Sequence, residues 1–135
     1  MNIFIDTGPL RALVMPRDQW RTKTLSLFHK LSPENNRIIT TDYILDEVFT
    51  GLLGVQGGYM RIKEFDSVLK QKVLSVEWIT QARFLETKRL FLKIAKDKQW
   101  SFTDCTSFVV MKELKIKTVF TFDQHFEQMG FDLLA

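Results

Sequence analysis

Short apolar runs alternate along the chain with longer stretches in which apolar residues recur every three or four positions. Runs of the first kind predict buried strands, and four of them are clear. They cover residues 2–6, 37–41, 73–79 and 118–122. A fifth and shorter run, residues 131–134, predicts one more strand at the edge of the sheet.

The longer stretches predict helices between these strands. Thr7-Gly8-Pro9 breaks the first strand, and a helix follows it and ends near Pro16. Gly57-Gly58 opens a loop before another amphipathic stretch. Side chains that can cap helix N-termini precede four of the helices. They are Asp18, Thr41 or Asp42, Thr80 and Thr103.

Strands that alternate with helices over this length predict an α/β fold with a central parallel sheet. We expect four to five strands with helices on both faces. The chain has 135 residues, the size of one ordinary domain, and shows no repeat or linker. We therefore expect residues 1–135 to form a single domain.

Several protein classes are disfavoured by composition. No apolar run approaches the roughly 20 residues that a membrane-spanning helix needs. The first residues lack the basic start and apolar stretch of a signal peptide. Cys105 is the only cysteine, so we expect no disulfide framework and no thiolate metal site. These features predict a cytoplasmic protein without a membrane partner.

Acidic residues stand where parallel strands end. Asp6 follows the first predicted strand and Asp123 the fourth, while Asp104 lies in the first turn of a helix. Glu47 lies on the helix after the second strand. Ligands of open α/β sheets bind at the carboxyl ends of the strands. The four carboxylates are therefore candidates for one shared site.

Carboxylates that lie close together repel one another unless a cation compensates. Oxygen ligands of this kind suit Mg²⁺ or Mn²⁺, and such a site can hydrolyse phosphodiesters. Each acid also has a purely structural interpretation, which spacing leaves open. Asp6 can stabilise a turn, Asp104 a helix start and Asp123 an Asx-turn, and Glu47 can be a solvated helix position.

The charge of the chain becomes informative once these acids are set aside. The formal net charge is +3, from 19 basic and 16 acidic residues. Without four acidic ligands the balance is 19 − 12 = +7. A surface of that sign suits a nucleic-acid backbone, although lysines that only keep helices soluble would give the same balance.

At the same residues the sequence resembles the PIN-domain family, and particularly the VapC-type toxins of toxin–antitoxin pairs. The resemblance covers essentially the whole chain. It rests on four motifs in order: residues 4–10 (FIDTGPL), 41–48 (TDYILDEV), 101–108 (SFTDCTSF) and 121–126 (TFDQHF), the last followed by Gly130-Phe131.

The resemblance implies catalytic and metal-binding roles for Asp6, Glu47, Asp104 and Asp123, with Mg²⁺ or Mn²⁺ bound. It implies an endoribonuclease that hydrolyses single-stranded RNA, with water attacking the phosphorus in line. Only the resemblance selects Glu47 over Asp46, because both lie off the apolar face of their helix.

Three threonines lie next to or near the acids: Thr7, Thr103 and Thr121. They could support the carboxylates from a second layer or act only in caps and turns. His125, two residues after Asp123, could touch a phosphate. Cys105 is expected to be a small buried residue and no nucleophile, and the three tryptophans to belong to the core.

Family members of this type usually form homodimers and are held by an antitoxin, so the resemblance implies both partners. Segment 52–59, with its apolar residues and glycines, is the expected contact surface. Other functions stay open. They are a PIN nuclease of RNA processing, a catalytically silent PIN-like module that binds RNA or protein, and a receiver-like phosphate-transfer domain, which the acid at position 123 fits poorly.

Overall fold

The computed structural model describes residues 1–134 and contains a five-stranded sheet in which all neighbouring strands run parallel. Its strand order is β3-β2-β1-β4-β5. The strands are β1 (Asn2–Ile5), β2 (Arg37–Thr41), β3 (Leu74–Glu77), β4 (Thr118–Phe120) and β5 (Asp132–Leu133). The fold predicted from the sequence is confirmed, including the short edge strand.

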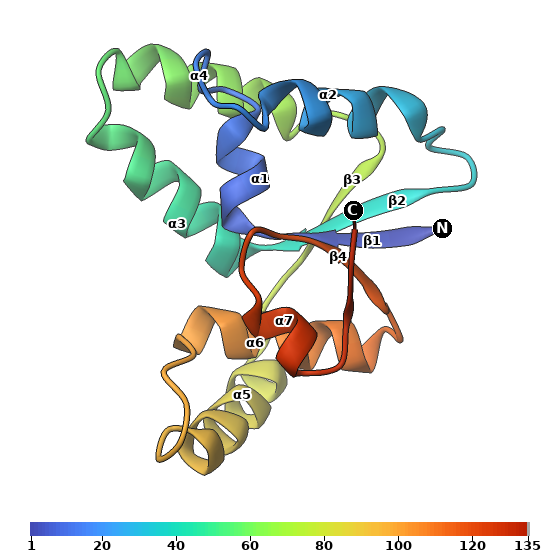
Figure 1. Cartoon of the computed structure of the whole chain (residues 1–135), viewed down its shortest axis with the longest axis vertical. Helices are drawn as coiled ribbons and strands as arrows, with labels where there is room; N and C mark the ends of the chain where they lie inside the picture. The colour runs from blue at the N-terminus through green and yellow to red at the C-terminus, as the bar shows by residue number, and fades with distance from the viewer. Residues whose placement is uncertain (135) are drawn as a thin grey trace.

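Helices cover both faces of this sheet (Figure 1). On one side lie α1 (Thr7–Ala12), α2 (Arg21–Lys30), α3 (Asp42–Leu53) and α4 (Gly58–Val68). On the other lie α5 (Gln81–Ile94), α6 (Phe102–Glu113) and α7 (His125–Gln128). The two groups separate because the chain builds outward from β1 to β3 and then returns to place β4 on the other side of β1. Right-handed crossovers place their helices on one face of the sheet while strands are added in one direction. They place them on the other face when strands are added in the opposite direction.

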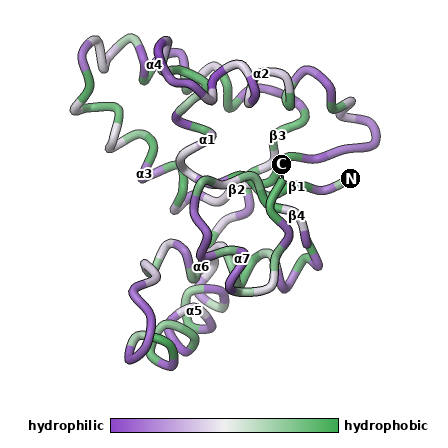
Figure 2. The backbone as a smooth tube through the Cα atoms, in the orientation of Figure 1, coloured by the Kyte–Doolittle hydropathy of each residue, from purple (hydrophilic) through white to green (hydrophobic). Residues whose placement is uncertain are grey.

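The centre of the sheet is apolar, as Figure 2 shows along the middle strands. Ile3, Phe4 and Ile5 of β1 are almost fully buried, because β1 pairs with a strand on each side and carries helices on both faces. Among the helices of residues 1–134, none is both long and apolar enough to cross a membrane.

The helix starts follow local capping. The Thr41 side chain accepts a hydrogen bond from the Ile44 N–H, and that of Thr80 caps α5 as predicted. The cap predicted at Thr103 is wrong. Helix α6 begins two residues earlier, because the Ser101 hydroxyl accepts from the Asp104 N–H at 3.0 Å and the Asp104 carboxylate accepts from the Ser101 N–H at 3.3 Å. This reciprocal pair is a capping box.

Other boundaries also differ from prediction: β3 covers Leu74–Glu77 instead of residues 73–79, and α1 ends at Ala12 instead of near Pro16. Helix α2 starts at Arg21, because the Asp18 carboxylate accepts from the Trp20 N–H at 2.8 Å and holds a turn before the helix. Trp20 therefore directly precedes the helix instead of belonging to it. Strand β4 ends at Phe120 instead of residue 122, because the Asp123 N–H donates to the Thr121 hydroxyl and turns the chain.

The expectation that all three tryptophans are core residues is also wrong. Trp100 is buried, whereas 37% of the Trp20 surface and 65% of the Trp78 surface are exposed. Leu53, at the C-terminal end of α3, is exposed as well.

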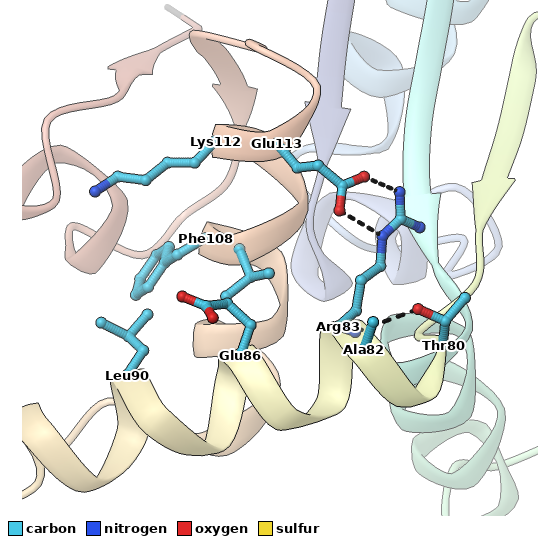
Figure 3. A pocket seen from close by; sticks show the side chains of 9 residues that line it. Thr80, Ala82, Arg83, Glu86, Leu90, Phe108, Lys112 and Glu113 are labelled. Atoms are coloured by element: carbon cyan, nitrogen blue, oxygen red, sulfur yellow. Dashed lines mark hydrogen bonds and ion pairs between the residues drawn. The ribbon is translucent and has the colours of Figure 1, made fainter.

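A hollow of about 500 Å³ lies between α5 and α6 on the face away from α1 (Figure 3). Arg83 stands at one end of it and pairs with Glu113 of α6 and, at 3.0 Å, with Glu77 of β3. The hydrogen bonds that the Arg83 guanidinium donates to Glu113 lower the pKa of that carboxyl. Arg83 thus ties the end of β3 to both helices. None of the four candidate acids lines this hollow.

We expect Phe108→Ala to lower the free energy of unfolding by about 3–5 kcal/mol, measured in urea. The Phe108 ring is fully buried on α6 and packs at 5.0–6.0 Å against the rings of Trp100, Phe126 and Phe131. Leu92→Ala on α5 is the control, since 65% of that side chain is exposed and its loss should cost less than about 1 kcal/mol. Equal losses in the two variants would contradict this description of the core.

Candidate active site

Two of the predicted acids meet at the point where the strand order of the sheet reverses. Asp6 directly follows β1, and Asp123 follows β4, which pairs with β1 through Ile5 and Phe120. The Asp6 N–H donates to the Phe120 carbonyl at 3.0 Å and extends this pairing by one residue. Crevices at such reversals are the usual ligand sites of open α/β sheets.

The hydroxyl of Thr121 connects these two acids. It donates to the Asp6 carboxylate at 2.8 Å and accepts from the Asp123 N–H at 3.0 Å. Thr121 is buried, so this hydroxyl uses both of its hydrogen-bonding functions inside the protein.

Asp104 and Asp123 form the tightest part of the cluster together with His125. One ligand atom from each of these residues lies within 4.8 Å of the other two. The His125 Nδ1 is 3.3 Å from Asp104 Oδ2 and 3.2 Å from Asp123 Oδ2. The first turn of α6 supplies Asp104, the turn after β4 supplies Asp123, and His125 is the first residue of α7.

His125, for which the sequence indicated no more than contact with a phosphate, belongs to this cluster. Its N–H donates to Asp123 Oδ1 at 2.9 Å, which makes an Asx-turn and brings the ring back over both carboxylates. The centroid of the buried Trp100 ring lies 5.8 Å from that of the imidazole. The only sequence signal was the spacing of two residues from Asp123, and spacing alone does not give the direction of a side chain.

Glu47 reaches the site from α3. Its Oε2 accepts a hydrogen bond from the Thr7 hydroxyl at 3.2 Å, and Thr7 is the residue directly after Asp6. Asp46 and Glu47 are both exposed, but among residues 1–134 the Asp46 carboxylate has no hydrogen-bond or ion-pair partner. This contact favours Glu47 over its neighbour, a choice that the helical pattern left open.

The supporting threonines divide into two groups. Thr7 and Thr121 each donate to a candidate acid. The Thr103 carbonyl accepts from the hydroxyls of Thr106 and Ser107, and within the part of the chain that the structure describes its own hydroxyl bonds to no acid.

Asp6 is the acid whose chemistry is most altered by its surroundings. Burial raises its pKa from the ordinary 3.8 to about 6, and the charges of Asp104 and Glu47 add to the increase. Hydrogen bonds from Thr121 and from the Thr7 backbone act in the opposite direction. Among the described residues, Asp6 and Glu47 are not part of the group of ligand atoms within 4.8 Å of one another, which Asp104, Asp123 and His125 form.

Cys105, next to Asp104, takes no part in this cluster. It is fully buried, and burial together with the charge of Asp104 raises the pKa of its thiol to about 11. A thiol with that pKa stays protonated near neutrality and is a poor nucleophile. The prediction of a buried residue is confirmed.

The donor set fits a hard divalent cation. The carboxylates offer negatively charged oxygen atoms, and the closeness of Asp104 and Asp123 is a repulsion that such an ion would relieve. The imidazole Nδ1 is a further potential ligand, and nitrogen suits Mn²⁺ better than Mg²⁺.

Comparison with known proteins relates this geometry to one family. The family model of the PIN domain matches residues 3–132. The 23S rRNA-specific endonuclease VapC20 of Mycobacterium tuberculosis is 29% identical over 129 residues, which are 96% of this chain and 95% of that protein.

Solved structures give the same result. The crystal structure of Mycobacterium tuberculosis VapC20, described as a sarcin-ricin loop cleaving toxin, superposes with a TM-score of 0.80 and 26% identity, over 96% of this chain and 95% of that one. VapBC2 from Rickettsia felis, bound to a DNA fragment from its promoter, has a TM-score of 0.74 and 15% identity, over 99% and 98%. At that identity the second likeness concerns the fold.

The raised pKa of Asp6 predicts a pH-dependent stability in the metal-free protein. Between about pH 4 and pH 6 the folded chain keeps a proton on Asp6 that the unfolded chain releases. The free energy of unfolding should therefore fall as the pH rises through this window, by at most about 3 kcal/mol. Urea unfolding in the presence of a chelator, compared between the parent protein and Asp6→Asn, measures this change in the free energy of unfolding with pH.

We expect Asp6→Asn to be more stable than the parent at pH 7 and to lose that advantage near pH 4. The amide oxygen can still accept from Thr121, so the variant should keep the local structure. A constant difference between the two proteins across the whole range would contradict the assignment.

Proposed function

The chain belongs to the PIN-domain family, and we propose that it is a metal-dependent endoribonuclease, the toxin of a toxin–antitoxin pair. One observation carries the proposal: Asp104, Asp123 and His125 offer ligand atoms within 4.8 Å of one another, and the Thr121 hydroxyl links Asp6 to Asp123. The likeness to a 23S rRNA-specific endonuclease along 96% of the chain supports the same activity.

We infer that Asp6, Glu47, Asp104 and Asp123 hold Mg²⁺ or Mn²⁺. A divalent cation at such a site supplies a water of lowered pKa and neutralises charge that develops on a phosphodiester. The chain's own residues keep this site in shape. Thr121 fixes Asp6, Thr7 fixes Glu47, and the capping box with Ser101 fixes Asp104 in the first turn of α6.

His125 would act between the carboxylates and the RNA. Its Nδ1 faces Asp104 and Asp123, and one third of the side chain is exposed. A residue in this position can orient both carboxylates, or donate a hydrogen bond to a phosphate oxygen when protonated. Single-stranded RNA is the proposed substrate, because the phosphodiester of an unpaired strand can reach the partly exposed side chains of Asp123 and His125.

Two protein partners complete the proposal. An antitoxin would cover the acid cluster and block access of RNA, and complexes of this kind are among the structural neighbours. A second copy of the chain would pack at the tip of the α3–α4 hairpin. There Leu53, Tyr59 and Met60 are each more than half exposed, and such apolar surface is typical of contact sites. A cytoplasmic location agrees with RNA as the substrate.

Cleavage of a labelled mixed-sequence single-stranded RNA tests the activity. We expect cutting with Mg²⁺ or Mn²⁺, none with chelator, and a loss of more than about 100-fold in Asp104→Asn, since even supporting residues of metal sites contribute about 10–100-fold. Asp46→Asn is the matched control and should cut like the parent protein. Glu47→Gln should lose activity as Asp104→Asn does.

Several outcomes would count against the proposal. Full activity in Asp104→Asn would remove that residue from the mechanism, and equal effects of Asp46→Asn and Glu47→Gln would reject the choice between these neighbours. A folded protein that neither cuts RNA nor binds metal would favour a silent PIN-like module.

Metal binding can be measured without any substrate. We expect Mn²⁺ to raise the melting temperature of the parent protein, with about 2.7 kcal/mol of stabilisation at a hundred times the dissociation constant. Asp123→Asn should lose most of this shift, and Asp46→Asn should keep it. An equal shift in all three proteins would place the ion elsewhere.

A further inference from the structure

A pocket of about 440 Å³ lies next to the acid cluster and is not explained by metal binding. Its walls come from α1, from the loop before α2 and from the turn after β4. Gly8 is two residues after Asp6, and Phe122 directly precedes Asp123, so the same two segments supply the acids and this pocket. The volume is within the range of about 300–1,000 Å³ that is typical of small-ligand sites.

Two aromatic rings in the pocket wall are paired and partly open to solvent. The centroids of Trp20 and Phe122 are 4.9 Å apart, with an angle of 31° between the rings. Of their surfaces, 37% and 44% are exposed. Such rings normally lie in the core, so a pair left open at the edge of an active site indicates a contact surface.

Gly8 allows this pair to stand close to the first acid. A Cβ atom at this position would lie 2.7 Å from Cδ2 of the Phe122 ring, which is too close for any side chain. The absence of a side chain at Gly8 therefore lets the ring lie against the first turn of α1, next to Asp6.

Positive charge surrounds the rings. Arg11 and Arg17 line the pocket, both are exposed, and neither pairs with a carboxylate within residues 1–134. The Lys23 Nζ lies 5.6 Å from the centroid of the Trp20 ring. The one acid of the pocket wall, Asp18, is engaged through Oδ1 by the Trp20 N–H.

We propose that this pocket binds one unpaired nucleobase of the RNA, next to the phosphodiester that lies at the acids. The inference rests on the proposed nuclease function and extends it to how the strand is held. Unpaired bases stack on exposed aromatic rings, and arginine and lysine near the rings attract the phosphates on either side. Stacking of this kind accepts any base, so the pocket fixes the position of the strand without reading its sequence.

Binding of a short single-stranded oligoribonucleotide tests the pocket, with anisotropy of a terminal fluorophore as the signal. All proteins carry Asp6→Asn so that the strand is not cut. We expect Trp20→Ala to weaken binding by roughly 5- to 150-fold, the range measured for loss of one stacked base. Trp20→Phe should retain most of the affinity, and Trp78→Ala, which removes an exposed tryptophan beyond β3, should leave it unchanged.

An abasic scan then separates stacking from general loss of affinity. One abasic site is moved along the oligoribonucleotide. At one position it should weaken binding to the protein that has Trp20 and make no difference to Trp20→Ala, since both changes remove the same contact. At the other positions the two effects should add.

Equal affinity of the Asp6→Asn protein with and without Trp20→Ala would overturn the proposal. Additive effects at every position of the scan would overturn it too. Either result would leave the nuclease assignment intact, because cleavage by the protein with Asp6 in place is measured separately. Cutting in the Asp6→Asn background would instead count against the proposed function. Trp20 is partly exposed, so a thermal unfolding curve suffices to check that its variants fold.

Discussion

The hydrogen bonds of the Thr121 hydroxyl are the contacts on which the arrangement of the acids depends. This one group donates to the Asp6 carboxylate and accepts from the Asp123 N–H, so it joins the ends of β1 and β4. Like charges drive carboxylates apart, and each acid here is held against that repulsion by a polar contact. Thr7 holds Glu47, Ser101 holds Asp104, and the Asx-turn at His125 holds Asp123. Local turns and caps therefore keep the acids together.

The topology of the sheet decides where this happens. Since β1 lies between β2 and β4, strands are added on both sides of β1. The helices that connect them therefore lie on both faces of the sheet. Asp6 follows the end of β1, a strand whose apolar residues Ile3 to Ile5 are almost fully buried. The same apolar layer that stabilises the fold removes water from Asp6 and raises its pKa. Stability of the core and chemical reactivity of the acid thus have a common origin.

Much of this architecture could be predicted from the sequence, because parallel strands buried on both faces leave unmistakable apolar runs. The positions of Asp6 and Asp123 followed from those runs, and the resemblance to a family supplied Glu47. What failed depended on side-chain direction. The tryptophans were expected in the core, but the Asp18 turn delays the helix and leaves the Trp20 ring beside Phe122. Thr103 was chosen as a cap, although Ser101 stands three residues before Asp104 as a capping box requires.

Because Asp104 has two functions, it affects the order in which related proteins can lose their acids during evolution. Its carboxylate belongs to the acid cluster and also closes the capping box that starts α6. A substitution that removes this carboxylate would weaken a helix, and purifying selection on folding would oppose it even where the activity is dispensable. Asp6 is different, because its buried charge works against folding near neutral pH. Lineages that no longer need the enzyme should therefore lose the first acid before the third, and inactive descendants should be recognisable by that order.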